Sequence, residues 1–230
     1  MIPRFIKLPL KTISNINGYN PKIGELLDRK FWIFDLDGTL TVAVHDFPAI
    51  REELGIPANA DILKFIQSQD QSTADRMLAK LDGIEIDLAN QSRPAEGAVE
   101  LVTELKKTSA QLGIITRNTR ENAKISLDKI GILDQFEDIC ILGRQEAPPK
   151  PDPSSINQLL TYWKISSEQA VMVGDYLFDL QTGKAVGAAT IHVSTNMDAV
   201  WPELTDIHVP SLTQLVQMLI WKTTSAPFEN

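Results

Sequence analysis

Cysteine is nearly absent from this chain of 230 residues, in which Cys140 stands alone. A single cysteine cannot form a disulfide within the chain, so the sequence excludes a disulfide-stabilised scaffold and is compatible with a reducing compartment. Cys140 lies in the apolar run 139–142, and we interpret it as a buried core residue rather than as a reactive thiol.

Long hydrophobic runs are absent as well. No stretch approaches the ~18 apolar residues that a membrane-spanning helix needs. The opening segment MIPRFIKLPLKTISN has charges that interrupt its apolar residues and no continuous signal-peptide core, although its basic, serine-containing character leaves a transit peptide as an alternative. We therefore expect a cytoplasmic protein with no membrane partner.

Basic residues are outnumbered, with 22 lysines and arginines against 30 acidic residues and a net charge of −8. A surface of that sign repels polyphosphates, so no nucleic-acid partner is expected. A small anion is not excluded, because a site can be locally positive on an acidic protein. Hydrophobic residues make up 43% and charged residues 23% of the chain, which excludes a disordered chain and a fibre and favours a soluble globular protein.

Five short apolar runs recur along the chain and lack the alternation of a half-exposed strand. They are residues 31–34, 112–115, 139–142, 170–173 and 189–193. Helical patterns lie between them, such as Leu101, Val102 and Leu105 at helical spacing. Strands that alternate with helices predict an α/β fold, namely a Rossmann-like parallel sheet with helices on both faces.

Residues 41–93 interrupt this alternation, because they contain no comparable strand and two or three helix-like segments. One predicted helix begins after Asp46, a second covers 62–66, and a third carries an apolar stripe behind Ser72. We therefore predict a small all-helical cap inserted after the first strand. The expected division is a core of residues 30–40 and 94–230, a cap of residues 41–93, and an N-terminal extension of unknown role, residues 1–29.

Two carboxylates follow the first predicted strand, in Asp35-Leu36-Asp37-Gly38-Thr39-Leu40. In extended chain the side chains of Asp35 and Asp37 point the same way, toward the carboxyl edge where open parallel sheets bind ligands. Adjacent carboxylates repel each other unless a cation lies between them. Mg²⁺ is usually coordinated by one or two carboxylates together with water molecules. A solvated turn before Gly38 is the alternative interpretation of this motif alone.

Polar residues also follow the later strands. Thr116 and Asn118 stand after the second strand, where a hydroxyl and backbone N–H groups can bind a phosphate oxygen. Lys150 is held between prolines, and its point charge suits a phosphate and a carboxylate together. Asp175 follows the fourth strand, and Asp179 lies one helical turn further on.

Taken in order, Asp-Leu-Asp-Gly-Thr-Leu, Thr116, Lys150 and Gly-Asp-x-x-x-Asp resemble the four motifs of the haloacid dehalogenase-like hydrolase superfamily. The resemblance covers roughly residues 30–195, and the helical segment after the first motif matches the first type of cap in that family. Leu-Gly-Ile-Ile-Thr-Arg-Asn, Pro-Pro-Lys-Pro and Val-Gly-Asp-Tyr-x-x-Asp look most similar to phosphoglycolate phosphatase-like members.

The resemblance implies a Mg²⁺-dependent phosphomonoester hydrolase that acts on a small phosphorylated metabolite through an aspartyl-phosphate. Asp35 would be the nucleophile. Asp37 would be the general acid for the leaving oxygen and then the base for the hydrolytic water. The metal ligands would be the Asp35 carboxylate, the Asp37 backbone carbonyl and Asp175.

The same resemblance assigns the phosphoryl oxygens to Thr116 and Lys150, with Asn118 as a helper, and counts Lys150 among the catalytic residues. Asp179 would orient Lys150 or the water shell of the metal. Catalysis would then consist mostly of positioning and charge neutralisation around the phosphoryl group. Arg117 lies near the predicted site mouth, and we favour its interpretation as a solvated residue over its alternative as a contact for a substrate anion.

Two alternatives stay open. A phosphomutase of the same family would keep every core residue and differ in the cap contacts that shield the phospho-enzyme from water. A non-catalytic phosphate-binding or signalling domain would be expected to have lost Asp35 or Asp37, and both are present. His45, His192 and His208 have no partner at metal-ligand spacing and are interpreted as structural or surface residues. Neither the substrate nor the oligomeric state is indicated.

Overall fold

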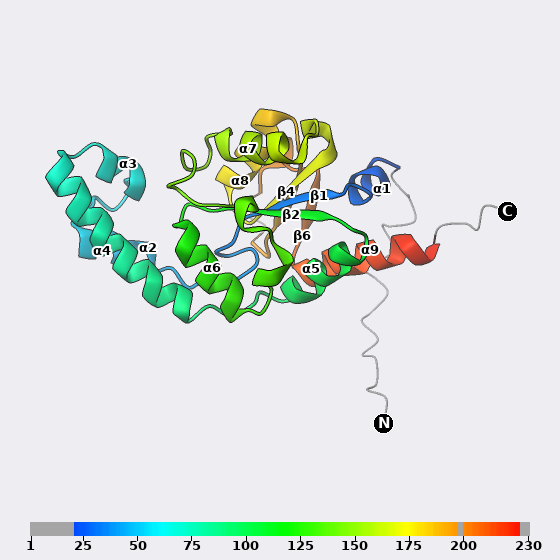
Figure 1. Cartoon of the computed structure of the whole chain (residues 1–230), viewed down its shortest axis with the longest axis horizontal. Coiled ribbons are helices and arrows are strands. Elements are labelled where there is room, and N and C mark those ends of the chain that lie inside the picture. Colours follow the sequence, from blue (N-terminus) through cyan, green and yellow to red (C-terminus); the bar gives the residue numbers. More distant parts are fainter. Residues whose placement is uncertain (1–20, 197–199, 226–230) are drawn as a thin grey trace, which may run out of the picture.

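A computed structural model describes residues 21–196 and 200–225 and contains one six-stranded parallel sheet in the order β3-β2-β1-β4-β5-β6 (Figure 1). The strands are β1 (Phe31–Phe34), β2 (Gln111–Ile115), β3 (Ile141–Leu142), β4 (Ala170–Gly174), β5 (Ala189–Val193) and β6 (Ile207–Val209). Because the chain winds outward from β1 in both directions, the strand order reverses between β1 and β4. A ligand crevice is expected at the carboxyl ends of these two strands.

Helices cover both faces of the sheet, as predicted. They are α1 (Pro21–Leu27), α5 (Ala98–Lys107), α6 (Arg120–Lys129), α7 (Ser154–Trp163), α8 (Leu177–Val186) and α9 (Leu212–Ser225). In Figure 1, α7 and α8 lie on one side of the sheet, and α5, α6 and α9 lie on the other. Short 3₁₀ turns cover Leu133–Gln135, Asp138–Cys140, Ser167–Gln169 and Pro202–Leu204. None of the helices in the described ranges is long and apolar enough to cross a membrane.

The side chains of β1 supply two separate hydrophobic clusters, one on each face. Trp32 and Phe34 pack with residues of α5, α6 and α9, whereas Ile33 packs with residues of α7. Successive strand residues point to opposite faces, so a strand covered by helices on both sides must be apolar at every position. This explains why the predicted strand runs lack alternation.

Two details of the sheet differ from the sequence-based prediction. The run 139–142 is only half a strand, because Asp138–Cys140 forms a 3₁₀ turn that leaves Ile139 exposed and β3 begins at Ile141. Cys140 itself is buried, as predicted. The sheet also has a sixth strand, β6, that was not predicted, since three residues with His208 in the middle give too short an apolar signal.

The N-terminal residues that the structure describes pack on the core. Leu26 and Leu27 of α1 join the larger hydrophobic cluster. Lys222 of α9 forms an ion pair with Asp28 and donates a hydrogen bond to the carbonyl of Gly24. Residues 21–29 therefore contribute to the core, while residues 1–20 lie outside the described ranges.

Three helices follow β1 and form a helical insert, residues 41–93, that extends from one end of the sheet (Figure 1). The helices are α2 (Phe47–Leu54), α3 (Ile62–Gln67) and α4 (Gln71–Asn90). As predicted, Asp46 caps α2, accepting a hydrogen bond of 3.0 Å from the N–H of Ala49. The predicted start of α4 behind Ser72 is wrong by two residues, because Asp70 is the cap and accepts from the N–H of Thr73.

The helical insert has its own hydrophobic core, in which Ile50, Ile66 and Leu81 are buried. The chain enters and leaves it through paired backbone segments. The Val42 N–H donates to the Arg93 carbonyl at 2.9 Å, and Thr41 and Pro94 form an antiparallel bridge.

Candidate active site

Three carboxylates gather at the carboxyl ends of β1 and β4 and form what we call the carboxylate cluster: Asp35, Asp175 and Asp179. Asp35 follows β1, Asp175 follows β4, and Asp179 lies in the first turn of α8. One oxygen from each carboxylate lies within 4.8 Å of the others. Gly38 permits this approach, since a Cβ at that position would lie 2.7 Å from Asp175 Oδ2 and its φ is +98°.

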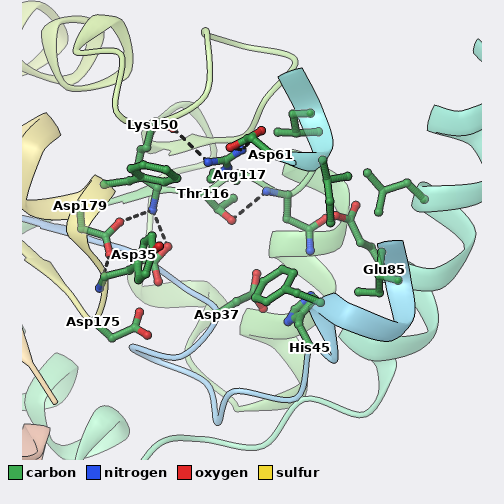
Figure 2. Close-up of a pocket in the computed structure, with 18 of the residues that line it drawn as sticks. Asp35, Asp37, His45, Asp61, Glu85, Thr116, Arg117, Lys150, Asp175 and Asp179 are labelled. Atoms are coloured by element: carbon green, nitrogen blue, oxygen red, sulfur yellow. Dashed lines mark hydrogen bonds and ion pairs between the residues drawn. The ribbon is translucent and has the colours of Figure 1, made fainter. Parts of the chain in front are cut away.

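Lys150 is buried against the carboxylate cluster, with its side chain pointing toward Asp35 and Asp179 (Figure 2). Its Nζ lies 2.5 Å from Asp35 Oδ1 and 2.7 Å from Asp179 Oδ1. Burial alone would lower the pKa of Lys150, but the charges of Asp179 and Asp35 outweigh it and raise that pKa above its usual value. The lysine is therefore a fixed positive charge beside two carboxylates.

The carboxylate cluster holds more negative charge than one lysine neutralises. Burial raises the pKa of Asp175 to about 8 and that of Asp179 to about 6, and the charge of Asp35 adds to both shifts. Carboxylates that lose water and repel each other favour either a proton or a bound cation. All the donors are oxygens, which is the ligand set that a hard divalent cation such as Mg²⁺ prefers.

Thr39 links two members of the carboxylate cluster. Its Oγ1 lies 3.1 Å from Asp35 Oδ2 and 3.1 Å from Asp175 Oδ1, so the single hydroxyl group can donate a hydrogen bond to either carboxylate. Thr39 stands within the first motif, and no role was predicted for it. Its position four residues after Asp35 is the only sequence signal for this contact.

Asp37 points into the same space without joining the carboxylate cluster (Figure 2). Burial raises its pKa, the charge of His45 opposes this shift, and the charge of Asp35 adds to it. A hydrogen bond from Asn118 also acts on Asp37. The side chains of Asp35 and Asp37 thus have different surroundings although they are two residues apart.

The residues after β2 form a compact polar turn at the start of α6. The N–H of Asn118 donates to Thr116 Oγ1 at 3.0 Å. Asn118 Oδ1 in turn accepts from the N–H of Thr119 at 2.8 Å and from Asn122 Nδ2 at 3.0 Å. These bonds fix the Asn118 amide and hold Thr116 at the wall of the site, beside the N-terminus of a ten-residue helix.

All the residues of the predicted site line one cavity of about 330 Å³. We call its inner part the portion lined by the predicted residues Asp35, Asp37, Thr116, Asn118, Lys150, Asp175 and Asp179. Its outer part is lined mainly by the helical insert, through His45, Phe47, Ile50, Arg51, Asp61, Ile62, Leu63, Leu81 and Glu85, and by Arg117, Tyr176 and Phe178 of the core. The structure therefore brings together every residue that the sequence analysis selected.

The interpretation of Arg117 as a solvated residue is wrong. Its Nη2 lies 2.8 and 2.7 Å from the two carboxylate oxygens of Asp61, and its guanidinium lies 5.0 Å from the ring centroid of Phe178. Although burial would raise the pKa of Asp61, hydrogen bonds from Lys64 N–H and Arg117 hold it below its usual value.

His45 and Glu85 also line the cavity without having been selected. Both belong to the helical insert, where no sequence motif marks them. His192 is structural, as interpreted, since it is fully buried and its Nε2 lies 3.2 Å from the backbone carbonyl of Asp175. His192 therefore contacts the backbone of Asp175, which is one member of the carboxylate cluster.

Comparisons with known proteins agree with this fold and these motifs. The model of a family described as haloacid dehalogenase-like hydrolase matches residues 32–193. A haloacid dehalogenase-like hydrolase domain-containing protein of Arabidopsis thaliana is 30% identical over 198 residues, which cover 81% of this chain and 79% of that protein. The phosphoglycolate phosphatase of Rhodospirillum rubrum is 28% identical over 195 residues, which cover 70% of this chain and 78% of that protein.

Solved structures share the fold. CbbY from Rhodobacter sphaeroides, determined in complex with phosphate, matches with a TM-score of 0.65 and 18% identity, covering 81% of this chain and 96% of that one. At this level of identity the likeness concerns the fold alone.

Proposed function

The chain belongs to the haloacid dehalogenase-like hydrolases, in their phosphoglycolate phosphatase-like branch, and we propose that it is a Mg²⁺-dependent phosphomonoesterase that forms an aspartyl-phosphate on Asp35. The enzyme class, a phosphatase acting on small phosphate substrates, follows from the family. One observation carries the finer proposal: Asp35 lies buried at the inner end of the cavity, 2.5 Å from Lys150 and beside Asp175 and Asp179.

Asp35 would attack the phosphorus atom of the bound ester, forming the bond from its carboxylate oxygen to phosphorus while the bond from phosphorus to the leaving oxygen breaks. Asp37 would give its proton to that leaving oxygen. Burial raises the pKa of Asp37, which favours the protonated form that a general acid needs. The alcohol then leaves through the outer part of the cavity.

In the second step a water molecule would attack the same phosphorus atom, and Asp37, now a carboxylate, would accept its proton. The bond from phosphorus to Asp35 breaks, which restores the Asp35 carboxylate and releases inorganic phosphate. The residues of the helical insert that line the outer cavity, such as Ile62 and Leu63, would limit the entry of further water.

The remaining residues would bind and orient the phosphoryl group. Lys150 and Thr116 would hold its oxygens, with Asn118 as a helper, and Asp179 would keep Lys150 in place through their 2.7 Å ion pair. Asp35, Asp175 and the backbone carbonyl of Asp37 would hold Mg²⁺, which when bound offsets the negative charge of the phosphoryl oxygens.

A small phosphorylated metabolite is the proposed substrate class. The cavity of about 330 Å³ is at the small end of the range for ligand pockets, and part of it must take the phosphoryl group itself. The relative from Rhodospirillum rubrum is named for a two-carbon phosphate ester, which supports a small leaving group here too. The proposed location of the enzyme is the cytoplasm.

Hydrolysis of para-nitrophenyl phosphate tests the proposal, measured with Mg²⁺ and with a chelator, for wild type, Asp35→Asn and the exposed control Asp134→Asn. We expect Mg²⁺-dependent turnover that falls by about 1,000-fold or more in Asp35→Asn and stays unchanged in the control. Acid quenching of the wild type with a labelled ester should trap phosphate on Asp35.

Two outcomes would contradict this proposal. Folded, Mg²⁺-loaded wild type that hydrolyses neither this ester nor a panel of phosphorylated metabolites is not a phosphatase. Transfer of phosphate to a second hydroxyl of a sugar phosphate, without release of inorganic phosphate, would identify the phosphomutase alternative instead.

A further inference from the structure

The helical insert places a buried carboxylate in the wall of the cavity. Glu85 lies on α4, is 8% exposed, and lines the cavity on the side opposite Lys150 and Asp179 (Figure 2). The proposed mechanism gives the inner carboxylates a task and leaves Glu85 without one. A charged side chain is rarely buried unless it has a partner or a function.

Glu85 shares its partner with a second acid. Arg144, between β3 and α7, has its Nη1 2.8 Å from Glu85 Oε2, while its Nη2 forms an ion pair with Asp82. One guanidinium between two carboxylates leaves a net charge of −1 when both acids are ionised. Asp82 is half exposed and is absent from the cavity wall, so Glu85 presents this charge to the cavity.

Glu85 faces the part of the cavity that receives the leaving group. Glu85 and Asp37 line the same cavity. Burial raises the pKa of Glu85 to about 7 against the opposing charge of Arg144, and the charge of Asp37 adds to the shift. Asp37 is the group proposed to protonate the leaving oxygen. Atoms attached to that oxygen therefore extend from Asp37 into the space that Glu85 borders.

Of the two arginines of the cavity wall, one is neutralised by a carboxylate and the other is held by a backbone carbonyl. Arg117 is paired with both carboxylate oxygens of Asp61. Arg51 donates its Nε–H to the carbonyl of Ala60 at 2.9 Å. A carboxylate on a leaving group that extends toward Glu85 rather than toward Arg51 would meet the negative charge of the buried Glu85, and like charges repel strongly where water is scarce.

We propose that Glu85 determines leaving-group specificity, favouring small phosphate esters that carry a hydroxyl or ammonium group near the ester oxygen and disfavouring those that carry a carboxylate there. The carboxylate of Glu85 accepts a hydrogen bond from a hydroxyl or ammonium donor and repels a second carboxylate. This inference rests on the proposed phosphatase function and adds the substrate class.

Three two-carbon esters test it, because they differ only in the terminal group: 2-phosphoglycolate has a carboxylate, ethylene glycol monophosphate a hydroxyl, and phosphoethanolamine an ammonium. For the Mg²⁺-loaded wild type at pH 8, above the Glu85 pKa of about 7, we expect kcat/KM for the last two to exceed that for 2-phosphoglycolate by about tenfold or more. Glu85→Gln should reduce this preference by about tenfold, and Glu85→Asp, which keeps the charge, should retain most of it.

Asp82→Asn is the matched control, since Asp82 shares Arg144 with Glu85 and does not line the cavity. If Glu85 acted only by holding Arg144, both substitutions would change the preference alike. We expect Asp82→Asn to leave the preference within about twofold of wild type. Thermal unfolding of each variant confirms that it is folded.

Calorimetric binding of the three esters to wild type and Glu85→Gln measures the same preference without turnover. If none of the esters is hydrolysed, the proposed phosphatase function is contradicted, while the binding data still test the role of Glu85. The inference is overturned if wild type prefers 2-phosphoglycolate in turnover and binding, or if Glu85→Gln and Asp82→Asn leave the same preference as wild type.

Discussion

Arg117 and Asp61 join the core to the helical insert through an ion pair in which Arg117 Nη2 lies 2.8 and 2.7 Å from the two carboxylate oxygens. Arg117 directly follows Thr116, and its Nη1 lies 3.4 Å from the carbonyl of Lys150. Asp61 is also the cap of α3, accepting from the N–H of Lys64 at 3.0 Å. One contact therefore relates the position of α3 to two residues that we propose bind the phosphoryl group.

Asp61→Asn should separate the capping of α3 from the ion pair with Arg117, because asparagine caps a helix nearly as well as aspartate but carries no charge. We expect kcat/KM for para-nitrophenyl phosphate to fall by about three- to tenfold, with little change in the melting temperature. Asp70→Asn is the control, since Asp70 caps α4 in the same way and has no arginine partner among the residues that the structure describes. Equal effects of the two substitutions would exclude a special role for the ion pair.

Lys150→Met should lower kcat/KM by about 100-fold or more, because it removes the positive charge between Asp35 and Asp179 and leaves both carboxylates buried. Lys150→Arg should not restore activity, since a planar guanidinium does not fit the enclosed space of a point charge. Steady-state kinetics, with exposed Lys129→Met as the control, measures both effects. Full activity in Lys150→Met would refute the proposed role.

Gly38→Ala should weaken Mg²⁺ binding by about tenfold or more, since the new Cβ would lie 2.7 Å from Asp175 Oδ2 and displace that carboxylate. Gly55→Ala is a matched control, with φ +69° and no atom within 4 Å of its Cβ. It should lose only about 1–2 kcal/mol of stability from backbone strain. The measurement is the Mg²⁺ concentration that gives half-maximal activity, and similar values for both variants would contradict the prediction.

The raised pKa of Glu85 predicts that the free energy of unfolding depends on pH. Burial raises its pKa from 4.5 to about 7, so the folded state binds more protons than the unfolded state in that interval, and stability falls as the pH rises through it. Relative to wild type, Glu85→Gln should therefore gain stability between pH 5 and pH 8, by at most about 3 kcal/mol. Urea unfolding without Mg²⁺ at both pH values tests this, and an unchanged difference would contradict it.

The inner site could be predicted from the sequence because parallel strands deliver their carboxyl ends to one edge. Asp35, Thr116 and Asp175 each follow a strand directly, so the strand pattern alone indicates that they meet. Lys150 stands in a loop, and its place was predicted from the prolines on either side of it together with the other motifs, with the family resemblance as further support.

The outer site could not be predicted in the same way. Asp61, Glu85 and His45 reach the cavity only through the packing of three helices on one another and on the core. An acidic residue on an amphipathic helix has the same sequence signal whether it faces solvent or a cavity. The sequence therefore indicated the part of the site that we propose binds phosphate, and it gave no information on the part that we propose meets the leaving group.

The entry and exit of the helical insert have an evolutionary consequence. The chain passes from Leu40 to Val42 and returns from Arg93 to Ala95 along paired backbone, with the Ala95 N–H donating to the Leu40 carbonyl at 2.9 Å. Two adjacent connections allow the sequence between them to be exchanged without rerouting any strand of the sheet. We expect that replacing residues 43–92 with the corresponding segment of a relative would transfer that relative's preference for the leaving group, while the residues proposed to bind phosphate stay the same.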